Sequence, residues 1–256
     1  MSAEQNDYSE FMGKGKARER TFETEIPIGF FHSALLEPYR TRYFVEDEIV
    51  KDCEIEVDPA YRGIERMLQG MPVDKANIIT ERICGICSNG HLWSSVRTAE
   101  TGLKIGIPKA AQAIRVLAEE LERLHSHLLF IAHASEVLGH ETFAYRSFLM
   151  REPVMQILYM ISGNRVNYSI PVLGGVRPRT QITEWKGKAI LEAMDKLDAN
   201  LRKFIERFLS DIMVMSRLNG VGVCDKQTAI KYHAVGPTAR ASGVDLDYRT
   251  KMPEYK

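Results

Sequence analysis

The chain has 256 residues, of which 45% are hydrophobic, and its 34 acidic side chains balance its 34 basic ones. A chain of this length can bury one sizeable core or two small ones. A net charge of zero gives no reason to expect a nucleic-acid partner or direct attraction to a membrane surface. No apolar run approaches the ~20 residues of a membrane helix, so we expect any membrane association to run through partner subunits. The four cysteines fit a reducing compartment and not a disulfide framework.

The N-terminal region divides into an arm and a strand-forming segment. Residues 1–22 are polar, with basic side chains near their end, and we expect a solvated arm or a subunit contact. Within residues 23–58, two strand-like runs (40–45 and 49–57) flank a Glu-Asp-Glu turn. Cys53 alternates with charged residues in the second run. The pattern therefore predicts a small β hairpin or sheet, with Cys53 as a core residue.

The remainder, residues 59–256, has a helical pattern. Apolar side chains recur every three or four positions along residues 109–138 and 182–218, which predicts two long helices packed against one another. Residues 142–161 are apolar enough to be interior, and we expect Pro153 to kink or divide them. The sequence therefore predicts a mainly α fold, a helical bundle with a small N-terminal β hairpin or sheet. We expect residues 23–58 to form one structural domain with this helical core.

The most informative motif is Cys84-Gly85-Ile86-Cys87, followed by His91. Two thiols three positions apart can bind one soft metal from a single turn, and His91 can hydrogen-bond a thiolate from a following helix. We expect this helix to begin near Ser88, so that its N-terminus lowers the thiol pKa. On these residues alone the motif could be a redox dithiol, one arm of a zinc or iron–sulfur site, or part of a nickel–iron site. It could also be two small buried residues without a ligand.

For other polar residues, the sequence predicts structural or solvent-facing roles. The histidines at 125, 127, 133 and 140 are expected to be surface or hydrogen-bonded core residues and not a second metal site. The charged stripe of Glu119, Glu120, Glu122 and Arg123 predicts a solvated face, with Arg123 a candidate for a subunit contact. Cys224 is expected in the core or in a loop.

The wider context of the CxxC motif makes it specific. Residues 82–91 resemble the N-terminal metal motif of nickel–iron hydrogenase large subunits. Four further blocks are similar to the membrane-bound, energy-converting (group 4) branch of that family and follow the family order. They are residues 29–38 (GPxHPALKEP-like), 61–66 (HRGIE-like), 173–178 (the GGVR loop shared with the quinone-site subunit of respiratory complex I) and 235–243 (GPxARxSG-like). The chain is identified as a member of this family, with a nickel–iron hydrogenase large-subunit-like fold.

The resemblance implies a metal centre and a proton route. In the family, the two cysteines of this motif bind a nickel–iron centre, which makes Cys84 the terminal ligand of nickel and Cys87 the bridging ligand to iron. His91 would hydrogen-bond the bridging sulfur, and Glu37 would carry protons away from the metal. A carboxylate that caps a turn before a proline is the competing interpretation of Glu37. Arg82 joins His91 and Glu37 as an implied catalytic residue.

The resemblance also implies contacts with a partner's cofactor. Arg177, delivered by a Gly-Gly turn, would reach an iron–sulfur cluster of a neighbouring subunit and favour its reduced state. An exposed loop arginine is the alternative for this residue. His32 is the second residue implied to bind a cofactor. We expect the loop of residues 173–179 to lie at the contact with the iron–sulfur subunit.

The implied function is that of a catalytic large subunit in a membrane-bound respiratory oxidoreductase complex. Its reaction would be hydrogenase-type proton reduction or hydrogen oxidation at a nickel–iron centre fed by an iron–sulfur subunit. Expected partners are the iron–sulfur small subunit, a complex I 30-kDa-like subunit and membrane-arm subunits, at the cytoplasmic face of the membrane. A quinone-reducing complex I subunit is disfavoured, because that branch does not use this CxxC.

The sequence departs from the family in one important respect. The second CxxC of complete large subunits does not occur in these 256 residues. We therefore expect the C-terminal part of the family to lie on a separate chain, to be missing from this sequence, or to have been lost. Two alternatives stay open: a nickel-free relative that reduces another acceptor such as polysulfide, and a non-catalytic scaffold.

Overall fold

The computed structural model describes residues 24–28, 38–56 and 61–255. The chain divides into two compact units, Met1–Gly63 and Ile64–Lys256. The predicted arm and two predicted site residues, His32 and Glu37, lie outside the described residues. The expectation that residues 23–58 form one structural domain with the helical core stays a prediction.

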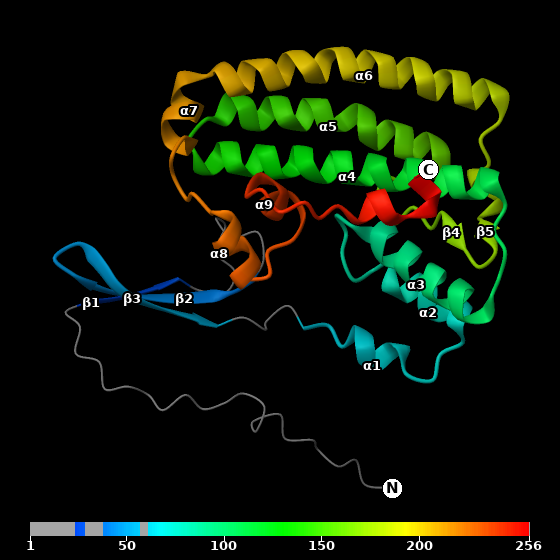
Figure 1. Cartoon of the computed structure of the whole chain (residues 1–256), viewed down its shortest axis with the longest axis horizontal. Coiled ribbons are helices and arrows are strands. Elements are labelled where there is room, and N and C mark those ends of the chain that lie inside the picture. Colours follow the sequence, from blue (N-terminus) through cyan, green and yellow to red (C-terminus); the bar gives the residue numbers. More distant parts are fainter. Residues whose placement is uncertain (1–23, 29–37, 57–60, 256) are drawn as a thin grey trace, which may run out of the picture. The chain divides into compact units, whose positions relative to one another are not determined.

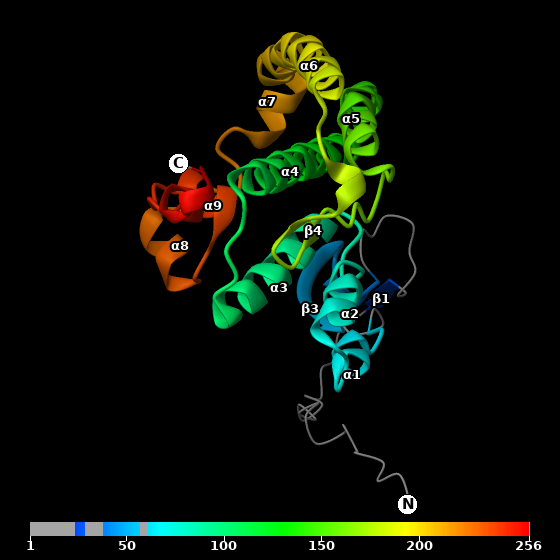
Figure 2. The same ribbon diagram turned by 90° about the vertical axis from the view of Figure 1, so that its right-hand side faces the viewer.

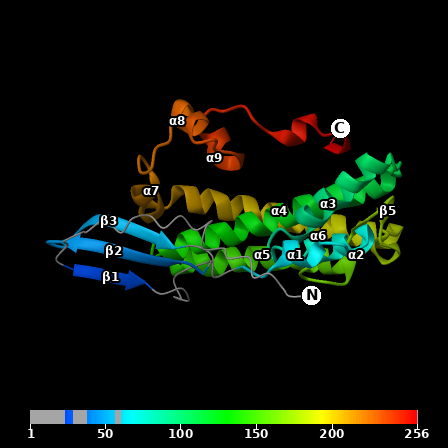
Figure 3. The same cartoon turned by 90° about the horizontal axis from the view of Figure 1, so that it is seen from below.

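The first unit contains a three-stranded antiparallel sheet in the order β1 (Thr24–Ile28), β2 (Arg40–Glu46), β3 (Ile49–Glu56) (Figure 3). Asp47 and Glu48 form the turn between β2 and β3 with φ values of 48° and 64°, as a tight two-residue hairpin requires. The predicted hairpin is confirmed. The expectation that Cys53 is a core residue is wrong, because Cys53 is exposed. No second layer covers β3 within the described part of this unit, so its side chains stay open on both faces.

The second unit is mainly helical, which confirms the predicted fold class (Figure 1). Its longer helices are α2 (Val73–Thr80), α3 (Ser88–Leu103), α4 (Lys109–Val137), α5 (Glu141–Ser162) and α6 (Glu184–Ser210). Short helices and strands complete it: α1 (Ile64–Leu68), β4 (Pro171–Val172), β5 (Gly175–Val176), α7 (Ile212–Leu218), α8 (Lys226–Lys231) and α9 (Gly236–Ala241). Three 3-10 turns lie at Pro178–Thr180, Tyr248–Lys251 and Pro253–Tyr255. No described helix is both long enough and apolar enough to cross a membrane.

The core lies among α4, α5 and α6, and α5 packs against both of the other two (Figure 2). Both predicted long helices occur, but they do not pack mainly against one another as predicted, because α5 is the main packing partner of each. Two further details differ from the prediction. The helix that starts at Glu184 ends at Ser210, because Asp211 is extended and its carboxylate caps α7 by accepting a hydrogen bond from the Val214 amide at 3.0 Å. Pro153 lies inside α5 without dividing it.

The apolar stripe of α4 meets α5 and α6 in a single cluster. Its buried members include Leu121 and Leu128 of α4, Phe143 and Leu158 of α5, and Phe204 of α6. The Phe143 ring meets the Phe204 ring edge-on at 6.0 Å between centroids, which adds to the apolar burial.

Leu128→Ala should test how much this cluster stabilises the chain. Leu128 is 1% exposed, so truncation leaves a cavity, and we expect a loss of about 2 to 5 kcal/mol in the free energy of unfolding. Urea denaturation measures it. The matched control is Leu149→Ala on α5, where the leucine is 65% exposed and the expected change is below about 0.5 kcal/mol. Equal losses in the two variants would contradict this assignment of the core.

Candidate functional site

The CxxC turn leads directly into α3. Cys87 is the N-cap residue of α3 and Ser88 is its first residue, which confirms the predicted helix start. The Cys84 sulfur accepts hydrogen bonds from the amides of Ile86 at 3.4 Å and Cys87 at 3.3 Å. These two hydrogen bonds turn the chain around the Cys84 sulfur.

The first turn of α3 is capped by a carboxylate from another helix. Glu122 of α4 is 3% exposed. It accepts hydrogen bonds from the Asn89 amide at 2.7 Å, the Gly90 amide at 2.9 Å and the Ser88 hydroxyl at 3.0 Å. The expectation of a solvated face is therefore wrong for Glu122. The free amides at a helix N-terminus attract an anion, and the Glu122 carboxylate takes that place.

This arrangement reverses the effect expected for the pKa of Cys87. We predicted that the N-terminus of α3 would lower the thiol pKa. Instead, the pKa of Cys87 is raised to about 12, first by burial of its partly enclosed sulfur, then by Cys84, Glu122 and Glu119. Burial also raises the pKa of Glu122 to about 7, and the charge of Glu119 adds to this effect. The hydrogen bonds from Asn89, Gly90 and Ser88 act in the opposite direction.

A second buried carboxylate anchors the segment before the CxxC. Glu81 is fully buried and accepts hydrogen bonds from the amide and the hydroxyl of Ser169, each at 2.6 Å. Arg82 is exposed, pairs with Glu81 and donates to the Ile78 carbonyl at 2.9 Å. Glu81 therefore fixes the motif to the loop that carries Ser169, and Arg82 lies next to this anchor.

His91 lies in the first turn of α3, where its amide donates to the Cys87 carbonyl at 3.2 Å. Its side chain is half-buried. Among residues 61–255, no hydrogen bond joins the His91 ring to the sulfur of Cys84 or Cys87. The hydrogen bond that the family resemblance implies stays a prediction.

A buried ion pair holds the backbone of the loop that contains Gly174 and Gly175. Arg115 of α4 pairs with Glu100 of α3 at 2.7 Å, and both side chains are buried. Glu100 accepts a hydrogen bond from the Gly174 amide at 2.8 Å, and Arg115 donates to the Gly175 carbonyl at 2.6 Å. Gly174 has a φ of 79°, a conformation that favours glycine. The pair therefore sets the shape of the loop that precedes Arg177.

Arg177 is half-buried and contacts backbone of its own chain. Its guanidinium donates to the carbonyls of Ser162 at 2.7 Å and Tyr168 at 3.1 Å. These contacts join the end of α5 to the loop that also carries Ser169, the partner of Glu81. The structure thus brings the loop of Arg177 and the anchor of the CxxC motif into one network.

Two of the four histidines, His125 and His140, make hydrogen bonds inside the fold. His125 is 1% exposed, and its Nδ1 lies 3.2 Å from Nη2 of Arg151. Burial, aided by the charge of Arg151, lowers the pKa of His125 to about 4. His140 caps α5 through the Phe143 amide, and its Nε2 lies 3.5 Å from the Asp211 carboxylate.

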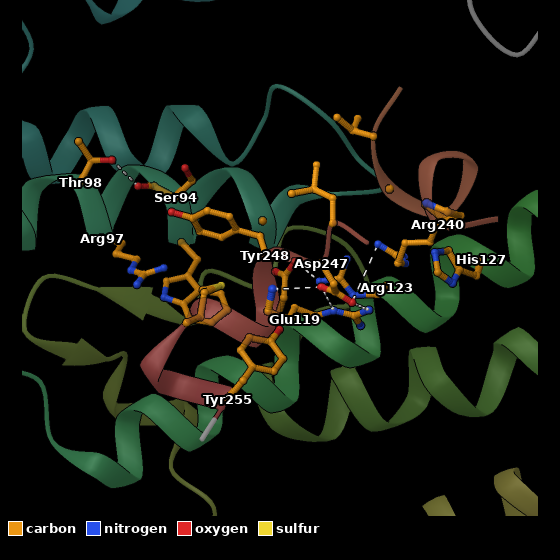
Figure 4. Close-up of a pocket in the computed structure, with 18 of the residues that line it drawn as sticks. Ser94, Arg97, Thr98, Glu119, Arg123, His127, Arg240, Asp247, Tyr248 and Tyr255 are labelled. Atoms are coloured by element: carbon orange, nitrogen blue, oxygen red, sulfur yellow. Dashed lines mark hydrogen bonds and ion pairs between the residues drawn. The ribbon is translucent and has the colours of Figure 1, made fainter. Parts of the chain in front are cut away.

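A cavity of about 920 Å³ lies between α3, α4 and residues 235–255 (Figure 4). Acidic and basic side chains line it together, among them Arg97, Glu119, Arg123, Arg240 and Asp247. Arg123 pairs there with Glu119 and Glu120, at 3.3 and 3.1 Å, within its own helix. The Tyr255 hydroxyl donates to Glu120 at 2.5 Å, which fastens the end of the described chain to α4.

The described residues contain two thiols of a type that could bind a metal. No group of three or more His, Cys, Asp or Glu side chains in the described ranges is placed to hold a metal ion. Cys84 and Cys87 are two soft donors on one turn, and soft thiolates suit nickel and iron. The donor set fits half of a four-thiolate centre.

Comparison with known proteins divides the chain between two family models. Residues 62–137 match the model described as nickel-dependent hydrogenase, and residues 138–256 match that of the respiratory-chain NADH dehydrogenase 49 Kd subunit. The membrane-bound hydrogenase subunit alpha of Pyrococcus furiosus is 36% identical over 88% of this chain and 52% of its own length. The carbon monoxide-induced hydrogenase of Rhodospirillum rubrum is 29% identical over 89% of this chain and 63% of its own length.

The fold is also similar to a solved structure. A chain of the membrane-bound sulfane sulfur reductase, described as an archaeal respiratory membrane complex, superimposes with a TM-score of 0.82 at 25% identity. The match covers 90% of this chain and 61% of the other. The chain thus spans about half to two thirds of the length of these relatives.

The pH dependence of stability should report the burial of Glu122. Its pKa is about 7 in the folded chain against 4.5 normally, so between these pH values the folded chain holds a proton that the unfolded chain releases. The contribution of Glu122 to stability is therefore full below pH 4.5 and is lost as the pH rises through 7. His125, with its pKa lowered to about 4, acts in the opposite direction.

Glu122→Gln should therefore make the free energy of unfolding rise with pH more steeply than in the wild type. The expected difference between the two chains changes by about 3 kcal/mol from pH 4.5 to 7. Urea denaturation at several pH values measures it, with Glu136→Gln, an exposed position on the same helix, as control. Parallel curves for E122Q and the wild type would contradict the assignment.

Proposed function

Because the chain belongs to the family that joins nickel-dependent hydrogenase large subunits with 49-kDa-type subunits of respiratory NADH dehydrogenases, we propose that it catalyses hydrogenase-type proton reduction or hydrogen oxidation. It is a catalytic-type subunit of a membrane-bound, complex I-related respiratory assembly. The proposed partners are an iron–sulfur small subunit that delivers electrons, a 30-kDa-like subunit and membrane-arm subunits. The proposed location is the cytoplasmic face of the membrane.

The observation that carries this proposal is the CxxC turn at the start of α3. Cys84 and Cys87 would hold a nickel–iron centre, with two further thiolates from outside these 256 residues. Such a centre, when bound, supplies the redox chemistry that joins electrons and protons. The chain's own contribution is to present two sulfurs on a turn that the Ile86 and Cys87 amides hold around Cys84 and that Glu122 fastens to α4.

Further residues take supporting roles in this proposal. His91, one turn into α3, would donate a hydrogen bond to the Cys87 sulfur once a ligand orders the site. Glu37 would accept protons from the site, and Arg82 would place positive charge beside the motif. Arg177 and His32 would face the cofactor of the iron–sulfur partner.

A second candidate is favoured by the similarity to the sulfane sulfur reductase chain. In that function the two thiols would react with a sulfur substrate such as polysulfide, and no nickel would be required. Thiolate nucleophilicity then controls the rate, so an alkylating reagent should abolish activity.

Cys84→Ser and Cys87→Ser should separate the candidates in the assembled complex. If the thiols hold nickel and iron, each substitution removes a soft donor that an alcohol cannot replace, and metal content and hydrogen turnover should both fall at least about tenfold. If they react with sulfur, the wild-type complex contains no nickel and the variants lose sulfur reduction. Elemental analysis with activity assays measures both, and Cys53→Ser, an exposed thiol of the first unit, is the matched control. Full activity in both variants would contradict both candidates and leave a structural role.

Arg177→Ala should slow electron delivery from the iron–sulfur partner without abolishing folding. The substitution removes the hydrogen bonds to the Ser162 and Tyr168 carbonyls, so we also expect the free energy of unfolding to fall by about 1 to 3 kcal/mol. Stopped-flow reduction of the complex and urea denaturation of the chain measure the two effects. Arg179→Ala, an exposed arginine two residues later, is the control. An unchanged electron-transfer rate would refute the role at the partner's cofactor.

A further inference from the structure

Two carboxylates of α4 converge on the first turn of α3. Glu122 accepts hydrogen bonds from the Asn89 and Gly90 amides. Glu119, one turn earlier, accepts a hydrogen bond from the Asn89 side-chain amide at 2.9 Å. A Cβ atom added at Gly90 would lie 3.6 Å from Oε1 of Glu119 and 3.7 Å from Oε2 of Glu122. The missing side chain of Gly90 therefore leaves a space that both carboxylates border.

The two carboxylates differ in their access to solvent. Glu122 is buried, whereas Glu119 and Gly90 line the cavity of about 920 Å³ between α3, α4 and residues 235–255. In Figure 4, Glu119 lies among the labelled lining side chains. The buried Glu122 and the cavity-lining Glu119 therefore lie in succession between the first turn of α3, which directly follows Cys87, and the cavity.

We propose that Glu122 and Glu119 form a proton relay between the CxxC turn and this cavity. The proposal deepens the function proposed above and rests on it to the extent that the CxxC turn is the place where protons are consumed or released. The cavity would be the water-filled end of the route. Such a route needs neither Glu37 nor the first unit of the chain.

The charges around the pair suit a relay. Glu122 faces the Ser88 hydroxyl, with Cys87 and Glu119 as its neighbouring acids and Tyr168 from the loop after α5. Its pKa of about 7 lets it both accept and release a proton near neutrality. Glu119 pairs with Arg123 at 3.3 Å and has the Asn89 side chain as a hydrogen-bond donor.

The transfer balances without any further reactant. A proton leaves the Cys87 thiol, whose S–H bond breaks to give a thiolate, and binds Oε2 of Glu122, while Oε1 keeps the hydrogen bonds from Ser88 and Asn89. The Oε2–H bond then breaks as the proton passes, directly or through a water beside Gly90, to the Glu119 carboxylate. Glu119 releases it to water in the cavity, which restores both carboxylates. Proton uptake follows the same steps in reverse.

Infrared spectroscopy of the full, metal-free chain tests the relay independently of any redox activity. We expect one protonated-carboxyl band that disappears with a midpoint near pH 7 and is absent in Glu122→Gln. On rapid mixing with D₂O, the band should shift at least about tenfold more slowly in Glu119→Gln than in the wild type. Its midpoint should also move to lower pH, because a like charge has been removed. Glu136→Gln is the control.

Gly90→Ala keeps the test decisive if E122Q does not fold. The added methyl group fits at ordinary contact distances and occupies the space between the carboxylates, so exchange should slow while both acids remain. Wild-type exchange rates in both E119Q and G90A would overturn the relay and leave Glu122 as a helix cap. The exchange could slow as expected in these variants while the assembled complex contains no nickel and turns over no hydrogen. That result would refute the proposed function and still support the relay.

Discussion

The hydrogen bonds from the first turn of α3 to Glu122 are the interaction on which the candidate site depends. α3 presents free amides directly after Cys87, and a single carboxylate from α4 satisfies two of them together with the Ser88 hydroxyl. The contact joins residues that are more than thirty positions apart in the chain. It holds the CxxC turn against the longest helix of the bundle, and through the core of α4 against α5 and α6.

Buried carboxylates and a buried ion pair likewise hold the irregular segments around the site in place. Glu81 secures the segment before Cys84 through Ser169, and the Glu100–Arg115 pair shapes the Gly-Gly loop. Burying such groups costs desolvation energy, and removing one partner leaves an unpaired buried charge. These contacts therefore contribute more to the definition of loop geometry than to net stability. They connect the CxxC turn to the loop that carries Ser169, and they attach the Gly-Gly loop to α3 and α4.

The division of the chain between two family models falls between two helices, but it does not separate two folding units. The hydrogenase match ends at residue 137 and the 49-kDa match begins at residue 138, which is the junction of α4 and α5. These two helices share one apolar cluster that includes Leu128 and Leu158. The part that carries the CxxC and the part that carries the Arg177 loop are therefore one folding unit, and a change in the core of either is expected to affect both.

The sequence by itself determined the hairpin, the helix periods of α4 and α6, the start of α3 after Cys87 and the family to which the motif belongs. These features depend on local patterns: alternation, apolar spacing and a motif of adjacent residues. Only the tertiary structure decided that Glu122 is buried, that α6 ends at Asp211 and that Cys53 is exposed. The side chain of a glutamate on a helix can face water, or it can be buried if hydrogen-bond donors surround it. The donors to Glu122 come from another helix, α3, so the pattern of α4 alone does not reveal them. The one available signal was that Glu122 shares its spacing with Ala118 and His125, on a stripe that the fold turns inward.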